Sequence, residues 1–264
     1  MRQDIEKIYN EGNDIFGLPQ IYKGINLYPI LLKDLKYQDL FYQIFAHPKN
    51  YIPNVEILKS SYLKFLIYVL SSVFGDNGTE VILALKKLMT YITKSEEIEL
   101  LYKQKDDLKG IDSIDLFLKV NDIIFNEDDF EAIREIILQQ NNMSIEYVES
   151  YNPELEDALR FINKDNADLS LSDQVFTFAV IMKIGLSEVQ GYSLFQFSNL
   201  MEKLLTLKEY DLYKPLLVSG QVTLKSGEIK HYLYHSMNKK NRYDSILIDK
   251  DSFMEKNKDA FGVI

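Results

Sequence analysis

Residues 116–125, LFLKVNDIIF, run directly into residues 126–140, NEDDFEAIREIILQQ, and together they decide the fold class. The first segment has two apolar runs on either side of Asn121 and Asp122, which is typical of a β-hairpin. The second segment opens with Asn126, a good helix cap, and has three acids in its first turn, where carboxylates meet the positive end of the helix dipole. A hairpin that leads straight into a helix predicts an α+β fold.

Upstream of this segment the pattern is mainly helical. Asp34 is placed to cap a helix that runs through Phe45, and Asn54 is placed to cap a long apolar helix over residues 55–74. A third helical pattern covers residues 79–93. Helices joined by such short turns predict a bundle-like N-terminal lobe.

Extended segments lie at three other places in the chain. Gly24 separates two short stretches within residues 20–32, and residues 98–104 and 114–120 have strand composition. Residues 221–234, QVTLKSGEIKHYLY, alternate around a Ser-Gly turn and predict a C-terminal hairpin.

The last third is helical before that hairpin. Asn152 followed by Pro153 predicts a helix start, since proline suits the first helical position. We expect a second helix from Ser172 that stops at Gly185. Residues 193–196 form a capping box in front of a third helix, and residues 210–217 predict a separate short helix.

These patterns predict an α+β, helix-dominated fold with two small antiparallel β-hairpin units. We divide the chain into a helical N-terminal lobe at 1–94 and an acidic hairpin-plus-helix unit at 95–150. A helical segment closed by the C-terminal hairpin follows at 151–264.

Composition indicates an ordinary globular protein. Of the 264 residues, 46% are hydrophobic and 27% are charged. The most apolar run, residues 65–74, is much shorter than the roughly 20 residues that a membrane-spanning helix needs. The N-terminus is charged from the start and shows no signal peptide. We therefore expect a cytoplasmic protein with no membrane partner.

Charge is unevenly distributed. The net charge is −10, and residues 95–170 contain twenty acids and seven bases, a net of −13. A negative centre repels phosphates and argues against general nucleic-acid binding. The segment is either a solvated acidic face or a surface that complements a basic partner.

Residue types that carry catalysis are scarce. The chain has no cysteine and three histidines, and it contains no nucleotide-binding, nucleophile-elbow or zinc motif. His231 and His235 are four residues apart on a predicted strand, about 13 Å along it, too far to share a metal without further ligands. We expect no catalytic residue, cofactor or metal site.

Two other patterns are superficially like ion or phosphate sites. Residues 163–168, NKDNAD, resemble the start of a calcium loop, but Ala167 stands at a ligand position and Asp168 replaces the required glycine. Asp251, in the pair Asp249-Lys-Asp251, is better explained as a helix cap. Neither pattern predicts a site.

A short basic stretch is the only candidate for contact with nucleic acid. Residues 239–243, KKNRY, combine three bases with an aromatic ring, a combination that can stack on single strands. Asp244, Asp249 and Asp251 dilute its charge. We expect no nucleic-acid partner.

The order of segments resembles a family of proteins encoded among the tail genes of tailed phages from Gram-positive hosts, the tail assembly chaperones. The stretches that carry the resemblance are YKGINLYPILLKD with IPNVEILKSSYLKFLIYVL, the hairpin leading into NEDDFEAIREIILQQN, NPELEDALRF, and YKPLLVSGQVTLKSGEIKHYLYHSMNKKNRYDSILIDKDSF. The resemblance implies a non-enzymatic protein that binds the long tape measure protein during tail assembly. Such a partner would need apolar grooves for amphipathic helices.

Two alternatives stay open. The chain could be a structural component of the virion, in the connector or baseplate. It could instead be a phage-encoded inhibitor of a host defence enzyme, with residues 95–170 docked on a basic site. In each case the sequence predicts a protein that works by binding other proteins.

Overall fold

The computed structural model describes residues 9–52, 54–70, 79–105, 113–162, 170–219 and 243. The chain divides into two compact units. Unit 1 comprises Met1–Tyr151 and Ser170–Met201, and unit 2 comprises Asn152–Leu169 and Glu202–Ile264. Residues from the segments predicted at 1–94 and 95–150 thus belong to one unit, and the division into three independent segments stays a prediction.

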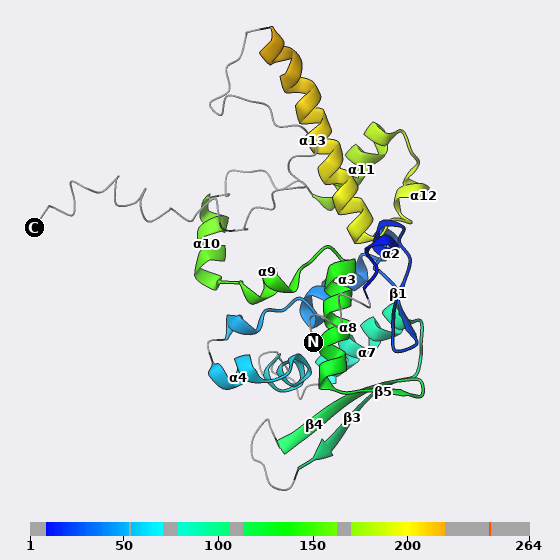
Figure 1. The fold of residues 1–264 in the computed structure, drawn as a ribbon, viewed down its shortest axis with the longest axis vertical. Coiled ribbons are helices and arrows are strands. Elements are labelled where there is room, and N and C mark those ends of the chain that lie inside the picture. Colours follow the sequence, from blue (N-terminus) through cyan, green and yellow to red (C-terminus); the bar gives the residue numbers. More distant parts are fainter. Residues whose placement is uncertain are drawn as a thin grey trace, which may run out of the picture. The chain divides into compact units, whose positions relative to one another are not determined.

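The fold is helix-dominated α+β, as predicted (Figure 1). The strands of unit 1 are β1 (Gln20–Tyr22), β2 (Ile25–Leu27), β3 (Ile98–Gln104), β4 (Ile114–Val120) and β5 (Ile123–Phe125). The longer helices of unit 1 are α3 (Lys36–Ile44), α7 (Thr79–Thr93), α8 (Glu127–Gln140) and α11 (Leu171–Met182). Its shorter helical elements are α2 (Glu11–Ile15), η1 (Leu32–Asp34), η2 (Lys49–Tyr51), α4 (Val55–Lys59), α5 (Tyr62–Lys64), η3 (Phe65–Leu70), α9 (Ile145–Glu149) and α12 (Leu186–Val189). Helix α10 (Pro153–Ile162) lies in unit 2, and α13 (Leu194–Val218) begins in unit 1 and continues into unit 2.

The three-stranded sheet confirms the strands predicted from residues 98–125. Its order is β3-β4-β5, and both pairs are antiparallel. The hairpin turns at Asn121, whose φ of 52° is the left-handed conformation that asparagine tolerates. Leu116, Leu118 and Val120 alternate along β4 and are buried, so one face of the sheet packs on the core.

The second sheet is the β1-β2 hairpin, which pairs Tyr22 with Ile25. Both turn residues, Lys23 and Gly24, have positive φ. This geometry is the one that tight hairpins require, and it explains the glycine that separates the two predicted stretches. The predicted C-terminal hairpin at 221–234 lies outside the described residues.

Helix α8 is the centre of the core of unit 1. Most of its side chains are buried, and Asn126 and Asp129 form a complete capping box at its start. The carboxylate of Asp129 also accepts a hydrogen bond from the Tyr22 hydroxyl at 2.9 Å and an ion pair from Lys23 at 2.6 Å. The cap predicted from sequence therefore also fastens the β1-β2 hairpin to α8.

The single helix predicted over residues 55–74 is wrong. Helix α4 ends at Lys59, Ser60 and Ser61 are extended, and α5 and the π-helix η3 follow. Serine side chains hydrogen-bond to nearby backbone and so compete with a continuous helix. Here Ser60 donates to the carbonyl of Ile57, and the Ser61 hydroxyl accepts from the N–H of Lys64.

Two predicted helix boundaries also need correction. Asp34 does not cap α3, which begins at Lys36 with no side-chain cap; instead, the Asp34 carboxylate accepts a hydrogen bond from the Tyr91 hydroxyl at 2.9 Å. Helix α11 begins one residue before Ser172, with Ser170 as its cap, and ends at a left-handed Lys183 rather than at Gly185.

Residues 194–218 form one helix, α13, rather than the two that were predicted. The capping box at its start is confirmed, because Ser193 and Gln196 exchange hydrogen bonds with each other's backbone N–H. Pro215 lies inside the helix, and the N–H of Ser219 still bonds to its carbonyl. Among the described helices, none combines the length and apolar character needed to cross a membrane.

Candidate functional site

Most of the residues weighed as sites from the sequence lie outside the described part of the chain. These are the histidines at 231 and 235, the calcium-like loop at 163–168, the aspartates at 249 and 251, and the basic residues at 239–242. Tyr243 is the exception.

Tyr243 has a structural role in unit 2. Its side chain is buried, and its hydroxyl donates to Glu156 at 3.0 Å and accepts from the N–H of Asn152 at 3.1 Å. The ring is therefore not available to stack on a base, and Tyr243 is removed from the candidate nucleic-acid site.

Five of the twenty acids in residues 95–170 form ion pairs within the described part of unit 1. The pairs are Glu99 with Lys119, Asp115 with Lys105, Glu127 with Lys64, Asp129 with Lys23, and Glu131 with Arg134. Lys105 and burial act oppositely on Asp115, and the hydrogen bond from Lys105 holds the pKa of that carboxyl below its usual value. Only two of the bases in these pairs, Lys23 and Lys64, lie outside residues 95–170, so the pairs change the net charge of the segment from −13 to −11 and leave most of it in place.

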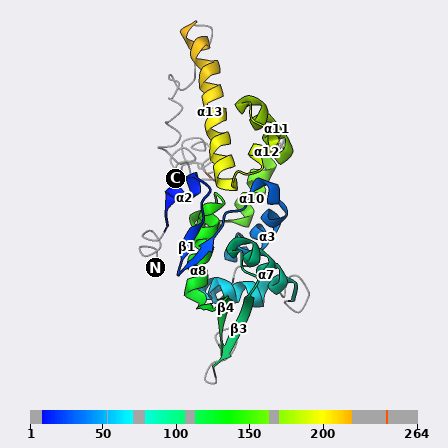
Figure 2. The same ribbon diagram turned by 90° about the vertical axis from the view of Figure 1, so that its right-hand side faces the viewer.

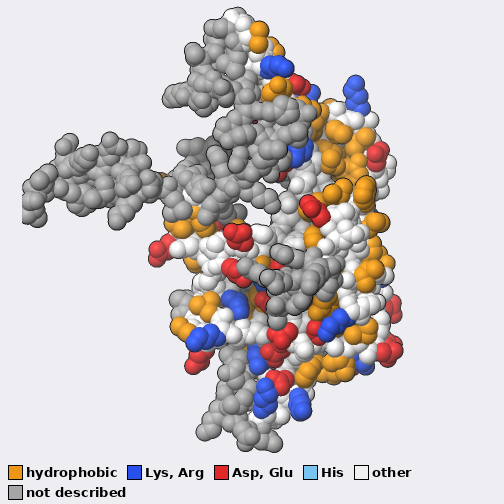
Figure 3. Space-filling view, viewed as in Figure 1, with side chains coloured by type: hydrophobic (Ala, Val, Ile, Leu, Met, Phe, Trp, Pro, Cys, Tyr) orange, Lys and Arg blue, Asp and Glu red, His pale blue; other side chains and the backbone are white. Residues whose placement is uncertain are grey.

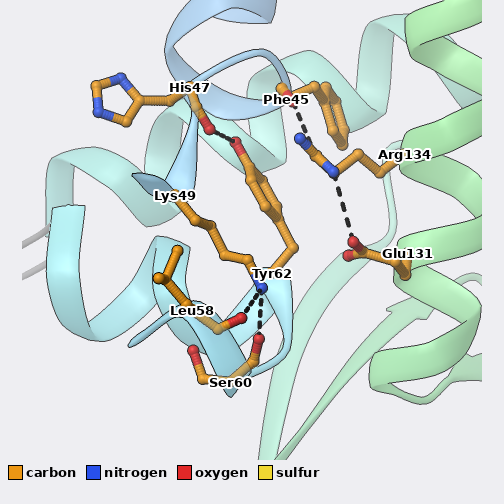
Figure 4. A network of polar contacts seen from close by, with 8 residues as sticks. All are labelled: Phe45, His47, Lys49, Leu58, Ser60, Tyr62, Glu131 and Arg134. Atoms are coloured by element: carbon orange, nitrogen blue, oxygen red, sulfur yellow. Dashed lines mark hydrogen bonds and ion pairs between the residues drawn. The ribbon is translucent and has the colours of Figure 1, made fainter. Parts of the chain in front are cut away.

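Arg134 is the centre of a buried polar network within unit 1 (Figure 4). Its Nε donates to the carbonyl of Phe45 at 2.9 Å, and its Nη1 lies 3.4 Å from Oε1 of Glu131. The guanidinium sits 3.6 Å from the centroid of the Tyr62 ring, a cation–π contact. The Tyr62 hydroxyl donates to the carbonyl of His47 at 2.9 Å.

Lys49 completes this network from η2. Its Nζ donates to the carbonyls of Leu58 and Ser60 at 3.1 and 2.7 Å, where the chain leaves α4. Burial lowers the pKa of the Lys49 amine, and the charges of Glu131 and Glu149 oppose that effect. Both cations therefore satisfy backbone carbonyls that the break after α4 and the end of α3 leave open.

The contacts of this network hold neighbouring elements together. The donors of Arg134 are directed at protein acceptors, and burial raises the pKa of Tyr62 to about 12. Burial also lowers the pKa of His47. Within the described ranges, no three metal-binding side chains come together. The network joins α8 to the η2–α5 segment and does not present a reactive group to a ligand.

The described surface feature that best fits a function is exposed apolar side chains on α11 and α12. Phe176 and Val180 are one helical turn apart and are 56% and 76% exposed, and Met182 and Leu186 follow at 44% and 48%. We call these four residues the α11–α12 surface; Phe176 and Val180 share one side of α11, whereas Met182 lies one turn after the buried Phe178, on the side that leads to α12. Hydrophobic side chains gather over these two helices in the space-filling view (Figure 3).

The buried residues of helix α11 lie on one side of it. Phe178 and Ala179 are its buried residues, and Phe178 packs edge-on against Tyr192 and Phe197.

On the opposite side of α11, Asp173 and Thr177 are polar and exposed. Phe176 and Val180 are exposed beside them, so a face expected to be mostly polar carries two large apolar side chains. The sequence predicted this helix, and its residues 175–182, VFTFAVIM, include a single polar residue, Thr177, which is typical of a buried or docked helix.

A second strip of exposed apolar side chains belongs to α2 and β1. Ile15, Phe16, Leu18 and Ile21 are each at least half exposed. The carbonyl of Ile15 accepts a hydrogen bond from the Gln196 side chain at 3.0 Å, so this strip adjoins the start of α13. Exposed apolar area of this kind marks interaction surfaces in soluble proteins.

No protein-family model matches the sequence, and comparisons with curated proteins and with solved structures likewise find no match.

Proposed function

We propose that this chain is a non-catalytic protein-binding factor in phage tail morphogenesis, which acts as a tail assembly chaperone and binds the tape measure protein in the host cytoplasm. The observation that supports the proposal most is the α11–α12 surface. The phage assignment itself comes from the sequence resemblance.

The α11–α12 surface suits an apolar helical partner. Burying an exposed side chain such as Phe176 or Val180 stabilises a complex by about 1–3 kcal/mol. The two side chains lie at i and i+4 on one helix, the spacing with which an apolar helix face meets another helix. An aggregation-prone partner kept soluble in this way would be held by its apolar face.

The inhibitor alternative relies on the negative charge of residues 95–170. Five acids of that segment form ion pairs within the described part of unit 1, but only Lys23 and Lys64 bring positive charge from outside it, so its net charge changes only from −13 to −11. A role as a virion component uses the same kind of apolar surface, and it differs from the chaperone role in whether the protein stays in the particle.

The first experiment is co-expression with the products of the neighbouring genes, followed by size-exclusion chromatography with mass analysis. The proposal predicts that one long, helix-rich protein becomes soluble only in the presence of this chain and co-elutes with it. A chain that binds none of these products, or that is stoichiometric in purified particles, would contradict the chaperone role.

Variants on α11 then test the surface. Val180→Asp should reduce recovery of the soluble partner at least tenfold, because it places a charge in the apolar contact. Leu83→Asp is the matched control, since Leu83 on α7 is 59% exposed and lies outside the surface. Equal loss with both variants, at unchanged circular dichroism, would show that the α11–α12 surface is not the binding site.

A further inference from the structure

Strand β3 is an open edge of the three-stranded sheet. Within the described ranges its one strand partner is β4. The β3–β4 hairpin extends away from the helices of unit 1 in both ribbon views (Figures 1 and 2). A seven-residue edge strand presents a row of backbone donors and acceptors that another strand can pair with.

The hydrogen bonds of the hairpin show which backbone groups face this edge. The N–H of Leu116 points away from β3, because it donates to Oε1 of Glu127 at 3.0 Å. Leu116 lies opposite Tyr102 in the register. In an antiparallel pair, the backbone N–H and C=O groups of two opposed residues either both face the partner strand or both face away from it. The backbone groups of Tyr102, and by alternation those of Leu100, therefore face the open edge. In agreement with this alternation, the N–H of Lys105 donates to the carbonyl of Ser113, just before β4, at 2.7 Å.

The opposite edge of the sheet, along β5 and the first half of β4, is shorter and partly covered. Strand β5 has three residues and pairs with the second half of β4. Where β5 ends, the Glu127 side chain occupies the edge at Leu116, and Lys64 pairs with the same carboxylate at 3.4 Å. Among the described strands, β3 therefore forms the long unpaired edge of this sheet.

The sequence of β3, IELLYKQ, is complementary to itself in the antiparallel direction. With a two-fold axis at Leu101, Glu99 of one copy faces Lys103 of the other. The same register places Leu100 opposite Tyr102. These two residues are the ones whose backbone groups face outward, so they form the hydrogen-bonded pairs, and the charged residues form the closer non-hydrogen-bonded pairs.

We propose that two copies of this chain associate through β3, pairing antiparallel about Leu101 to join their sheets into one continuous sheet. The exposed ring of Tyr102, 75% accessible in one copy, then packs beside Leu100 of the other. The contact that competes for Glu99 is an exposed pair with Lys119 at 3.4 Å, which is weak enough to be exchanged. Asp115, across from Lys103, is already paired with Lys105 at 2.6 Å.

A single cysteine tests the register. The natural chain has no cysteine, so Leu101→Cys introduces the one thiol that can react. On a two-fold axis, the non-hydrogen-bonded pair brings the two Cα atoms to about 4.5 Å, within the range of a disulfide. Mild oxidation of the full chain should give a cross-linked dimer, whereas Leu83→Cys on α7 should stay mostly monomeric. Equal cross-linking of both variants, or none at 101, would overturn the proposed register.

Charge reversal gives a second test that also controls for folding. Glu99→Lys and Lys103→Glu each place like charges in both cross-strand pairs and should weaken self-association about tenfold in analytical ultracentrifugation. When the two variants are mixed, positions 99 and 103 carry opposite charges across the interface, so the mixed dimer should form again. Mixtures that remain as weak as the separate variants would refute the pairing of these two positions.

Proline at the open edge is a third test. Tyr102→Pro removes an outward N–H and leaves the hydrogen bonds to β4 in place, so it should abolish the dimer while circular dichroism is unchanged. Tyr102→Thr keeps the N–H and the strand preference and should retain most of the association. A wild-type chain that is monomeric at all concentrations, or a proline variant that still dimerises, would contradict the proposal.

Discussion

Arg134 combines a full charge with almost complete burial, at 4% exposure. The cost of removing this charge from water is offset by the carbonyl of Phe45, the carboxylate of Glu131 and the face of the Tyr62 ring. Each partner comes from a different turn or segment, so the guanidinium connects α8 with the end of α3 and with α5.

Arg134→Met should therefore lower the free energy of unfolding by about 2–4 kcal/mol, because it leaves a buried carbonyl and part of a carboxylate without a donor. Urea denaturation followed by circular dichroism measures the change. Arg160→Met is the matched control, since Arg160 also pairs with an acid three residues away but is 77% exposed. A similar loss in both variants would show that the buried network adds nothing.

Asp14 is the second buried charge with a clear consequence. Burial raises the pKa of Asp14 to about 6, although a hydrogen bond from Gln20 acts to lower it. Its Oδ2 is buried and accepts no hydrogen bond within the described chain. The folded state therefore holds a proton that the unfolded state, with a pKa of 3.8, releases.

The contribution of Asp14 to stability should thus be fully present below pH 3.8 and lost as the pH rises through about 6. Asp14→Asn should be more stable than the natural chain at pH 7.5, by about 1–3 kcal/mol, and close to it at pH 4. Paired urea titrations at the two pH values measure the difference. His47, whose pKa is lowered by burial, makes stability depend on pH in the opposite direction. Its contribution is the same in both proteins, so it cancels in the difference between their free energies of unfolding. A constant difference across this range would refute the assignment.

At the scale of elements, α8 shows how a local signal and a tertiary contact coincide. Asn126 satisfies the N–H of Asp129 at 2.8 Å, and Asp129 returns a bond to the N–H of Asn126 at 3.2 Å. The same Asp129 carboxylate accepts a hydrogen bond from the Tyr22 hydroxyl and forms an ion pair with Lys23. Burial opposes these hydrogen bonds, but together they hold the pKa of Asp129 below its usual value.

Asn126→Ala should cost about 1–2 kcal/mol, because it removes the side-chain cap of α8, a largely buried helix of unit 1. Asp128→Asn is the control: Asp128 is an exposed acid in the same first turn that makes no capping hydrogen bond, and its interaction with the helix dipole is worth a few tenths of a kcal/mol. Thermal unfolding of the two variants separates these effects. Equal shifts in the melting temperature would mean that the cap is not the stabilising feature.

At the scale of the whole molecule, the chain passes from unit 1 to unit 2 and back before ending in unit 2. Unit 1 contains both described sheets and the Arg134 network, and its residues all precede Glu202. The buried aromatic and aliphatic side chains of α5, α7 and α8 supply its core. Unit 1 thus has what a stable domain needs without the last part of the chain.

A shortened chain of residues 1–201 should therefore unfold in one cooperative transition with the circular dichroism of a helix-rich protein. Urea titration combined with hydrogen exchange measures this, and the amides of α8 and β4 should remain the most protected. A shortened chain with fast exchange throughout would show that unit 1 depends on unit 2.

The sequence by itself determined the elements whose signals are local. The strands at 98–104 and 114–120, the turn at Asn121, helix α7 and the caps at Asn126 and Ser193 follow from patterns spanning a few residues. Cap hydrogen bonds and strand alternation depend on neighbours in the chain, so one sequence is enough to identify them.

The tertiary structure decided everything that depends on partners far along the chain. Asp34 bonds to Tyr91 instead of capping α3, and Arg134 is buried because Phe45 and Tyr62 meet it. The exposure of Phe176 and Val180 and the open edge of β3 likewise depend on which elements pack beside them. Composition states that these side chains are apolar or charged, but only packing determines whether they face the core, a partner or water.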